Sequence, residues 1–329
     1  MARAIIEIQG LTKRYGEVTA VDKLDLRVEE GEVFGLLGPN GAGKTTTTLM
    51  LLGLTEPTAG SASIEGVDCT RDPIRVKRTV GYLPDNMGFY PDMTGRENLR
   101  MTGKMNGLRG EALETRINEL LERMGMTEAA DRRASTYSKG MKQRLGIADI
   151  LLKDPDVLIL DEPTNGVDPE GIRELTALIR ELADRDGRTI LISSHQLHQI
   201  QQICDRVGIF VKGRLAACGR IEELAEQLEK ENGYCFAVAA QPGGAALEET
   251  LKSVEGVTRV DVEDGLCVVR ASADVRAAAA KRLIERDFQL TYLQKRGGDL
   301  DDIYAKYFEK AGEINAGKRK DGHRARQAR

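Results

Sequence analysis

The chain has 329 residues, of which 30% are charged and 41% are hydrophobic. This length exceeds one typical domain, and the composition predicts soluble folded units rather than disordered or membrane-spanning ones. The 48 Lys and Arg residues nearly balance the 52 Asp and Glu residues, so the net charge of -4 gives no general attraction to nucleic acid or anionic lipid. We therefore expect no nucleic acid partner.

No stretch approaches the roughly 18 consecutive apolar residues that a membrane helix requires, and Glu7 interrupts the apolar start too early for a signal peptide. The sequence thus predicts a cytoplasmic protein. Its five cysteines lie far apart without a CxxC pair, which favours reduced structural thiols over a disulfide framework or a zinc site.

Apolar runs alternate with helical patterns over residues 1–225, which we expect to form one domain. The run VFGLL precedes a glycine-rich turn and a helical segment, and the runs VLILD and TILIS follow later. This alternation predicts an α/β sheet core. Short alternating runs near the start predict an antiparallel β subdomain, and residues 88–150 have the apolar spacing of a helical insertion.

The composition and the pattern of apolar residues change after this domain. Residues 226–311 predict a small α+β accessory domain of order β-α-β-β-α-β-α, without a motif that assigns chemistry to it. A dimerisation or regulatory role is the simplest interpretation. Residues 312–329 carry a run of Lys and Arg, and we expect a disordered, solvated tail rather than a lipid-binding one.

Residues 38–45 read GPNGAGKT, which matches the eight-position P-loop with an apolar strand before it and a helix after it. Glycines let successive backbone N–H groups turn inward around a phosphate, Lys44 reaches the β- and γ-phosphates from a site that we expect to be solvated, and the Thr45 hydroxyl binds Mg2+. The sequence therefore predicts an ATP site with Mg2+ as cofactor. The expected nucleotide contacts are Gly38, Pro39, Asn40, Gly41, Ala42, Gly43, Lys44, Thr45 and Thr46.

The run VLILD ends in Asp161, and Glu162 follows directly. A carboxylate at the end of a buried parallel strand lies at the sheet edge where the P-loop also lies, so we expect Asp161 to hold Mg2+ with Thr45. Glu162 is then placed to accept a proton from the attacking water. The alternative is a helix-capping Asp–Glu pair.

The segment YSKGMKQR at residues 137–144 resembles the signature motif LSGGQ of ATP-binding cassette (ABC) proteins. Ser138 and Gly140 match the motif, whereas Tyr137, Lys139 and Met141 depart from it. Alone, the segment is equally consistent with a helix N-cap. Between a P-loop and LILDEP, it makes the chain similar to ABC ATPases over about residues 4–225.

This resemblance implies roles for four further residues. Tyr15 would stack on adenine, Asp168 would lie in a loop that touches a partner subunit, and His195 would be a catalytic residue at the γ-phosphate. Asp85 stands where the family usually has Gln, in the segment that links the Mg2+ site to the membrane partner, and its carboxylate can accept hydrogen bonds from metal-bound water. An ordinary strand-end Tyr15 and a solvated His195 are the alternatives.

In the family, two cassettes lie head to tail, so the resemblance implies a homodimer in which residues 138–141 complete the site of the other copy. It also implies a separate polytopic permease and a location on the inner face of the membrane through that permease. The segments GYLPD, FYPDMTGRENL and YSKGMKQRL resemble exporter-type ATPases of drug, sodium and copper-related systems. A soluble ABC ATPase acting on ribosomes, DNA or protein assemblies is the competing hypothesis. A sensor whose C-terminal domain binds a ligand is a third interpretation, and it is compatible with a transport ATPase.

Overall fold

The protein structure is a computed structural model that describes residues 3–196, 200–263, 265–296 and 303–307. It divides into two compact units, Met1–Cys218 and Gly219–Arg329. The boundary lies seven residues before the one expected at 225, because helix α8 (Ile221–Asn232) contacts strand β11 of the second unit. The tail 312–329 lies outside the described residues.

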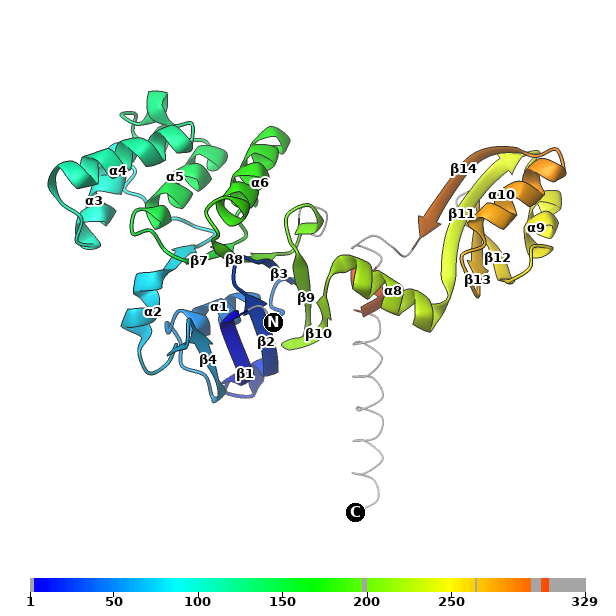
Figure 1. Cartoon of the computed structure of the whole chain (residues 1–329), viewed down its shortest axis with the longest axis horizontal. Coiled ribbons are helices and arrows are strands. Elements are labelled where there is room, and N and C mark those ends of the chain that lie inside the picture. The colour runs from blue at the N-terminus through cyan, green and yellow to red at the C-terminus, as the bar shows by residue number, and fades with distance from the viewer. Residues whose placement is uncertain (1–2, 197–199, 264, 297–302, 308–329) are drawn as a thin grey trace, which may run out of the picture. The chain divides into compact units, whose positions relative to one another are not determined.

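A six-stranded sheet forms the core of the first unit (Figure 1). Its strand order is β10-β9-β3-β8-β7-β6, and neighbouring strands from β9 to β6 pair in parallel. All residues of β3, β7 and β8 are buried, which explains why these strands are continuous apolar runs. The bounds are β3 Val33–Leu37, β6 Val80–Leu83, β7 Val157–Asp161, β8 Thr189–Ser194, β9 Arg206–Val211 and β10 Arg214–Gly219.

The expected antiparallel subdomain is a four-stranded sheet of order β2-β1-β4-β5. Burial alternates along β2, and its inward residues join one apolar cluster with Phe34 and Leu191 of the central sheet. The bounds are β1 Ala4–Tyr15, β2 Val18–Glu29, β4 Ala59–Ile64 and β5 Val67–Asp68, with helices α1 Lys44–Leu51 and α2 Pro73–Thr79.

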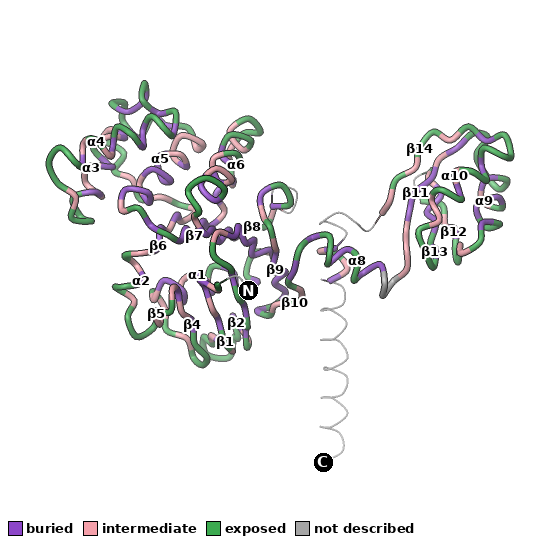
Figure 2. The backbone as a smooth tube through the Cα atoms, viewed as in Figure 1, coloured by how far each residue is buried: buried purple, intermediate pink, exposed green. Residues whose placement is uncertain are grey.

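The helical insertion consists of α3 (Gly95–Met105), α4 (Gly110–Arg123) and α5 (Lys139–Leu151), with two short 3-10 turns between α4 and α5. Apolar residues on one side of α4 are buried, as Figure 2 shows by the purple stretches of the tube. Arg100 of α3 donates to both carboxylate oxygens of Glu114 on α4, at 2.5 and 2.8 Å. Helix α6 (Pro169–Asp184) follows β7 in the chain.

The second unit has the expected order of strands and helices. Its sheet order is β12-β13-β11-β14 and every described pairing is antiparallel, with α9 packed on β12 and α10 on β14. This is the split β-α-β arrangement. The bounds are β11 Tyr234–Gln241, α9 Ala245–Lys252, β12 Val257–Glu263, β13 Leu266–Ala271, α10 Arg276–Glu285 and β14 Gln289–Arg296, and residues 303–307 are helical.

Candidate active site

A cavity of about 420 Å³ lies where β3 and β7 end. Parallel strands bring their carboxyl ends to the same edge of a sheet, so the P-loop after β3 and the carboxylates after β7 meet there. Asp85, in the loop after β6, also borders the cavity. The residues that line it are Ala20, Pro39, Asn40, Gly41, Ala42, Gly43, Lys44, Thr45, Thr46, Asp85, Asp161 and Glu162.

The P-loop backbone requires glycine at specific positions. Gly43 has φ of 110°, and a Cβ atom there would lie 2.5 Å from the carbonyl oxygen of Ala20. A Cβ atom on Gly38 would lie 2.8 Å from the carbonyl oxygen of Phe210. Because these side chains are absent, the loop can pass close to the backbone of β2 and β9. Its backbone N–H groups then lie at the start of α1, where they can bind an anion.

Lys44, the first residue of α1, is buried, with only 5% of its surface exposed, whereas the sequence led us to expect a solvated lysine. Its ammonium donates to the carbonyl oxygens of Gly38 at 2.6 Å and Pro39 at 3.3 Å, and lies 3.8 Å from Glu162. Burial lowers the pKa of Lys44, and the negative charges of Glu162 and Asp161 oppose this shift. A cation held below the P-loop in this way fits an anionic phosphate chain.

Asp161 ends β7 and is also buried. It accepts a hydrogen bond from the Thr45 hydroxyl at 3.4 Å and another from Ser193 of β8. Burial raises its pKa, and the nearby Glu162 charge adds to the shift. A carboxylate and a hydroxyl side by side are the hard oxygen ligands that Mg2+ prefers, so these residues fit the expected ion.

The side chains of Glu162 and His195 contact each other beside the Asp161 carboxylate. Glu162 has a left-handed backbone, with φ of 48°, and its side chain is 13% exposed. Its Oε2 atom lies 2.9 Å from Nδ1 of His195 and 3.3 Å from the Ser194 hydroxyl. The imidazole tautomer with its proton on Nδ1 can donate to Glu162, which orients this carboxylate toward the cavity edge.

The signature segment begins α5. The Ser138 hydroxyl accepts from the Met141 amide at 3.2 Å, so Ser138 is indeed a helix N-cap, and it is exposed. Asp168 similarly caps α6 by accepting from the Gly171 amide at 2.7 Å. Neither residue lines the cavity of its own chain in the described structure. Their expected roles toward a second copy stay predictions.

Tyr15 ends β1 with half of its surface exposed, and the Lys13 ammonium lies 4.9 Å from its ring centroid. It is not among the described residues that line the cavity, which Ala20 of the neighbouring β2 does border. Its role in stacking on adenine also stays a prediction.

Sequence reasoning missed the two serines that end β8. Ser193 is paired in register with Asp161, and Ser194 with Leu37 of β3, so this strand lies between the P-loop strand and the carboxylate strand. A signal was present, since two polar residues end the otherwise apolar run TILISS. Without the strand order, nothing connected them to Asp161 or Glu162.

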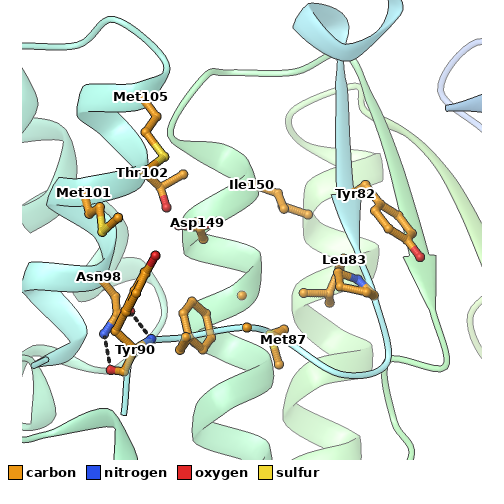
Figure 3. Close-up of a pocket in the computed structure, with 14 residues that line it drawn as sticks. Tyr82, Leu83, Met87, Tyr90, Asn98, Met101, Thr102, Met105, Asp149 and Ile150 are labelled. Atoms are coloured by element: carbon orange, nitrogen blue, oxygen red, sulfur yellow. Dashed lines mark hydrogen bonds between the residues drawn. The ribbon is translucent and has the colours of Figure 1, made fainter. Parts of the chain in front are cut away.

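A second cavity, of about 260 Å³, lies between the loop after β6 and helices α3 and α5 (Figure 3). Its walls are rich in methionine and aromatic side chains, including Met87, Met101 and Tyr90. Asp149 of α5 contributes a carboxylate, one oxygen of which is buried without a described hydrogen-bond partner. Burial raises the pKa of Asp149 to about 6, partly offset by a hydrogen bond with Thr102.

Sequence relatives match almost the whole chain. The bacitracin transport ATP-binding protein BcrA of Enterococcus faecalis is 35% identical over 302 residues, covering 92% of this chain and 96% of that protein. The chain belongs to the ABC transporter ATP-binding proteins. The ABC transporter family model itself matches residues 21–165.

Two further matches agree with this family. The Nod factor export ATP-binding protein I of Burkholderia lata is 36% identical over 92% of this chain and 97% of that protein. A solved ATP-binding subunit of an ABC transporter aligns with a TM-score of 0.62 and 32% identity, covering 68% of this chain and 93% of that structure. The predicted fold class and ATPase activity of an ABC subunit are thereby confirmed.

Proposed function

We propose that this ABC ATPase hydrolyses MgATP in a homodimer and thereby powers a separate membrane chain of the exporter type. One observation carries the proposal: a single cavity brings together the buried Lys44 ammonium, the Thr45–Asp161 pair and Glu162. The names of the relatives, one for bacitracin transport and one for Nod factor export, support transport of a compound out of the cell.

Each side chain has a distinct part in the proposed reaction. The P-loop amides and Lys44 bind the β- and γ-phosphates, and Thr45 and Asp161 would hold Mg2+, which withdraws charge from the transferred phosphoryl group when bound. Glu162 lies at the cavity and accepts the proton of the attacking water. His195 donates to Glu162 and holds its carboxylate in position.

The position of the signature segment supports the proposed homodimer. Ser138 is exposed and is not among the described residues that line the cavity of its own chain, which supports delivery of a signature segment to the nucleotide by a second copy. With one P-loop and one signature segment in the sequence, two copies give two equivalent sites. We infer that ATP closes the dimer and hydrolysis reopens it.

The cavity of Figure 3 is the surface that we assign to the membrane chain. It is lined by residues of the 84–90 loop, the same loop that carries Asp85 to the nucleotide cavity, so movement at one cavity can reach the other. The described residues include no helix long and apolar enough to cross a bilayer. We propose that the protein works at the inner membrane face through this partner.

Replacing Glu162 with Gln tests the proposed function. The amide keeps the shape of the side chain but cannot take a proton, so turnover should fall at least about 100-fold while MgATP still binds. The variant should run as a dimer in size-exclusion chromatography with ATP and Mg2+ and as a smaller species without nucleotide. Glu170→Gln, an exposed change on α6, is the control.

Near-wild-type turnover of Glu162→Gln would show that another group activates the water, and the roles of Asp85 and His195 would then need to be reassigned. A variant that binds MgATP but stays monomeric at all concentrations would contradict the proposed closed dimer.

A further inference from the structure

Two of the positions at which the chain departs from the family motifs, Asp85 and Lys139, contact each other. Asp85 stands in place of the usual Gln, and Lys139 stands in place of the first Gly of the LSGGQ motif. The Lys139 ammonium lies 3.6 Å from Oδ1 of Asp85 and donates to the backbone oxygen of Asp85 at 3.1 Å. Two separate substitutions thus form one ion pair.

The position of this pair matters because Asp85 borders the nucleotide cavity. Three carboxylates line that cavity, those of Asp85, Asp161 and Glu162, and the buried ammonium of Lys44 lies 3.8 Å from one of them, Glu162. An aspartate in place of a neutral glutamine adds a negative charge beside the site of the triphosphate. Lys139 supplies the positive charge that compensates it.

The pair also fixes the direction of the Asp85 carboxylate. The amide of Asn165 donates to Oδ1 of Asp85 at 3.2 Å, so this oxygen is held from two sides. Asn165 lies three residues after Glu162, and a Cβ atom on the adjacent Gly166 would lie 3.8 Å from Cγ of Lys139. The loop after β7 and the start of α5 therefore converge on Asp85.

We propose that Lys139 is a positioning residue for nucleotide binding in its own chain, acting by neutralising and orienting Asp85. The inference rests on the nucleotide site proposed above. The signature segment would then have a role in nucleotide binding within its own subunit, in addition to its proposed role in completing the site of a second copy. The side chains of Lys139 and Asp85 are 32% and 36% exposed, so the effect is moderate, of the order of a threefold to fivefold change in affinity.

The test measures binding of a fluorescent ATP analogue with Mg2+ to the full chain, in the Glu162→Gln background so that hydrolysis does not interfere. Lys139→Met keeps the length of the side chain and removes its charge, and should weaken binding about threefold to fivefold at low salt. Adding Asp85→Gln to Lys139→Met should return the affinity to within about twofold of the parent, because the uncompensated charge is then gone.

Two controls separate charge compensation from general damage to α5. Lys142→Met removes a charge from the next turn of the same helix and should leave the affinity unchanged, and Lys139→Arg should retain binding. The loss caused by Lys139→Met should shrink at about 0.5 M salt, since a partly exposed pair is screened. Thermal unfolding of each variant establishes that it is folded.

Unchanged affinity of Lys139→Met, or failure of Asp85→Gln to restore it, would overturn the inference. Lys44→Ala distinguishes this from failure of the underlying site. If Lys44→Ala loses nucleotide binding while Lys139→Met does not, only the inference is wrong. If Lys44→Ala binds the analogue as the parent does, the nucleotide site itself is wrong.

Discussion

Burial shifts the pKa values of Lys44 and Asp161 in the direction that disfavours the charged form of each side chain. It lowers the pKa of Lys44 and raises that of Asp161, and the mutual attraction of the two groups only partly opposes this. Both charges are therefore costly to keep without a ligand. Phosphate oxygens beside Lys44 and a metal ion beside Asp161 would relieve this cost, as expected if the site binds the proposed metal–phosphate unit.

Asp149 gives a pH-dependent prediction. Its pKa is raised from 3.8 to about 6, so the folded protein binds a proton more tightly than the unfolded chain, and stability falls as pH rises between these values. Asp149→Asn removes this cost. It should raise the free energy of unfolding by up to about 2–3 kcal/mol at pH 8, with the gain shrinking as pH falls and vanishing below about pH 3.

Chemical denaturation at several pH values measures this difference, with the exposed Asp92→Asn as the control. A gain that is constant over the whole pH range would mean that the buried carboxylate is not its source. The charge of Lys153 lowers the pKa of Asp149. A loss of stability at pH 8 would mean that the attraction between Lys153 and the Asp149 carboxylate outweighs the cost of burying that carboxylate.

The shape of the P-loop depends on individual glycines. Its path from β3 to α1 passes close to the backbone of Ala20 and Phe210, and the glycines at 38 and 43 allow this approach. The close contacts also connect the antiparallel subdomain to the phosphate site. A change in the loop should therefore alter both stability and nucleotide binding.

Gly43→Ala tests this dependence. The new Cβ atom would lie 2.5 Å from the Ala20 oxygen at a φ of 110°, so we expect a stability loss of about 1–3 kcal/mol and loss of ATP binding. Gly41→Ala is the matched control, because Gly41 also has a positive φ, of 79°, but nothing lies within 4 Å of its added Cβ atom. Thermal unfolding should show a larger loss of stability for Gly43→Ala than for Gly41→Ala. Equal losses would indicate that the positive φ, and not the close contact with Ala20, causes the destabilisation.

At the scale of the whole molecule, the proposed homodimer predicts complementation between two inactive chains. Ser138→Arg blocks the signature segment, and Lys44→Ala removes the phosphate-binding cation. A mixed dimer retains one intact site, formed by the P-loop of the first variant and the signature segment of the second. Equal mixing should restore about a quarter of the wild-type ATPase rate if the two sites act independently.

The experiment requires proof that mixed dimers form, for example by purification through two different affinity tags. Mixed dimers without any ATPase activity would contradict completion of each site by the other chain, or show that both sites must work together. Activity of either variant alone would instead contradict the role assigned to its changed residue.

The sequence alone determined the features that short, contiguous stretches of residues encode. The P-loop and the Asp161–Glu162 pair were predicted because each is a contiguous pattern beside an apolar strand, and the alternation of strands and helices predicted an α/β core and a small α+β unit. These signals need only neighbouring residues. The likeness of residues 137–144 to a signature motif then gave the family.

Only the tertiary structure decided which distant residues meet. The strand order β7-β8-β3 places Ser193 beside Asp161, and the fold brings Lys139 to Asp85 across 54 positions of sequence. It also buried Lys44, which the sequence had led us to expect in solvent. Such contacts depend on strand register and on packing of the helical insertion, and these are set by the balance of many nonlocal apolar contacts rather than by any short pattern.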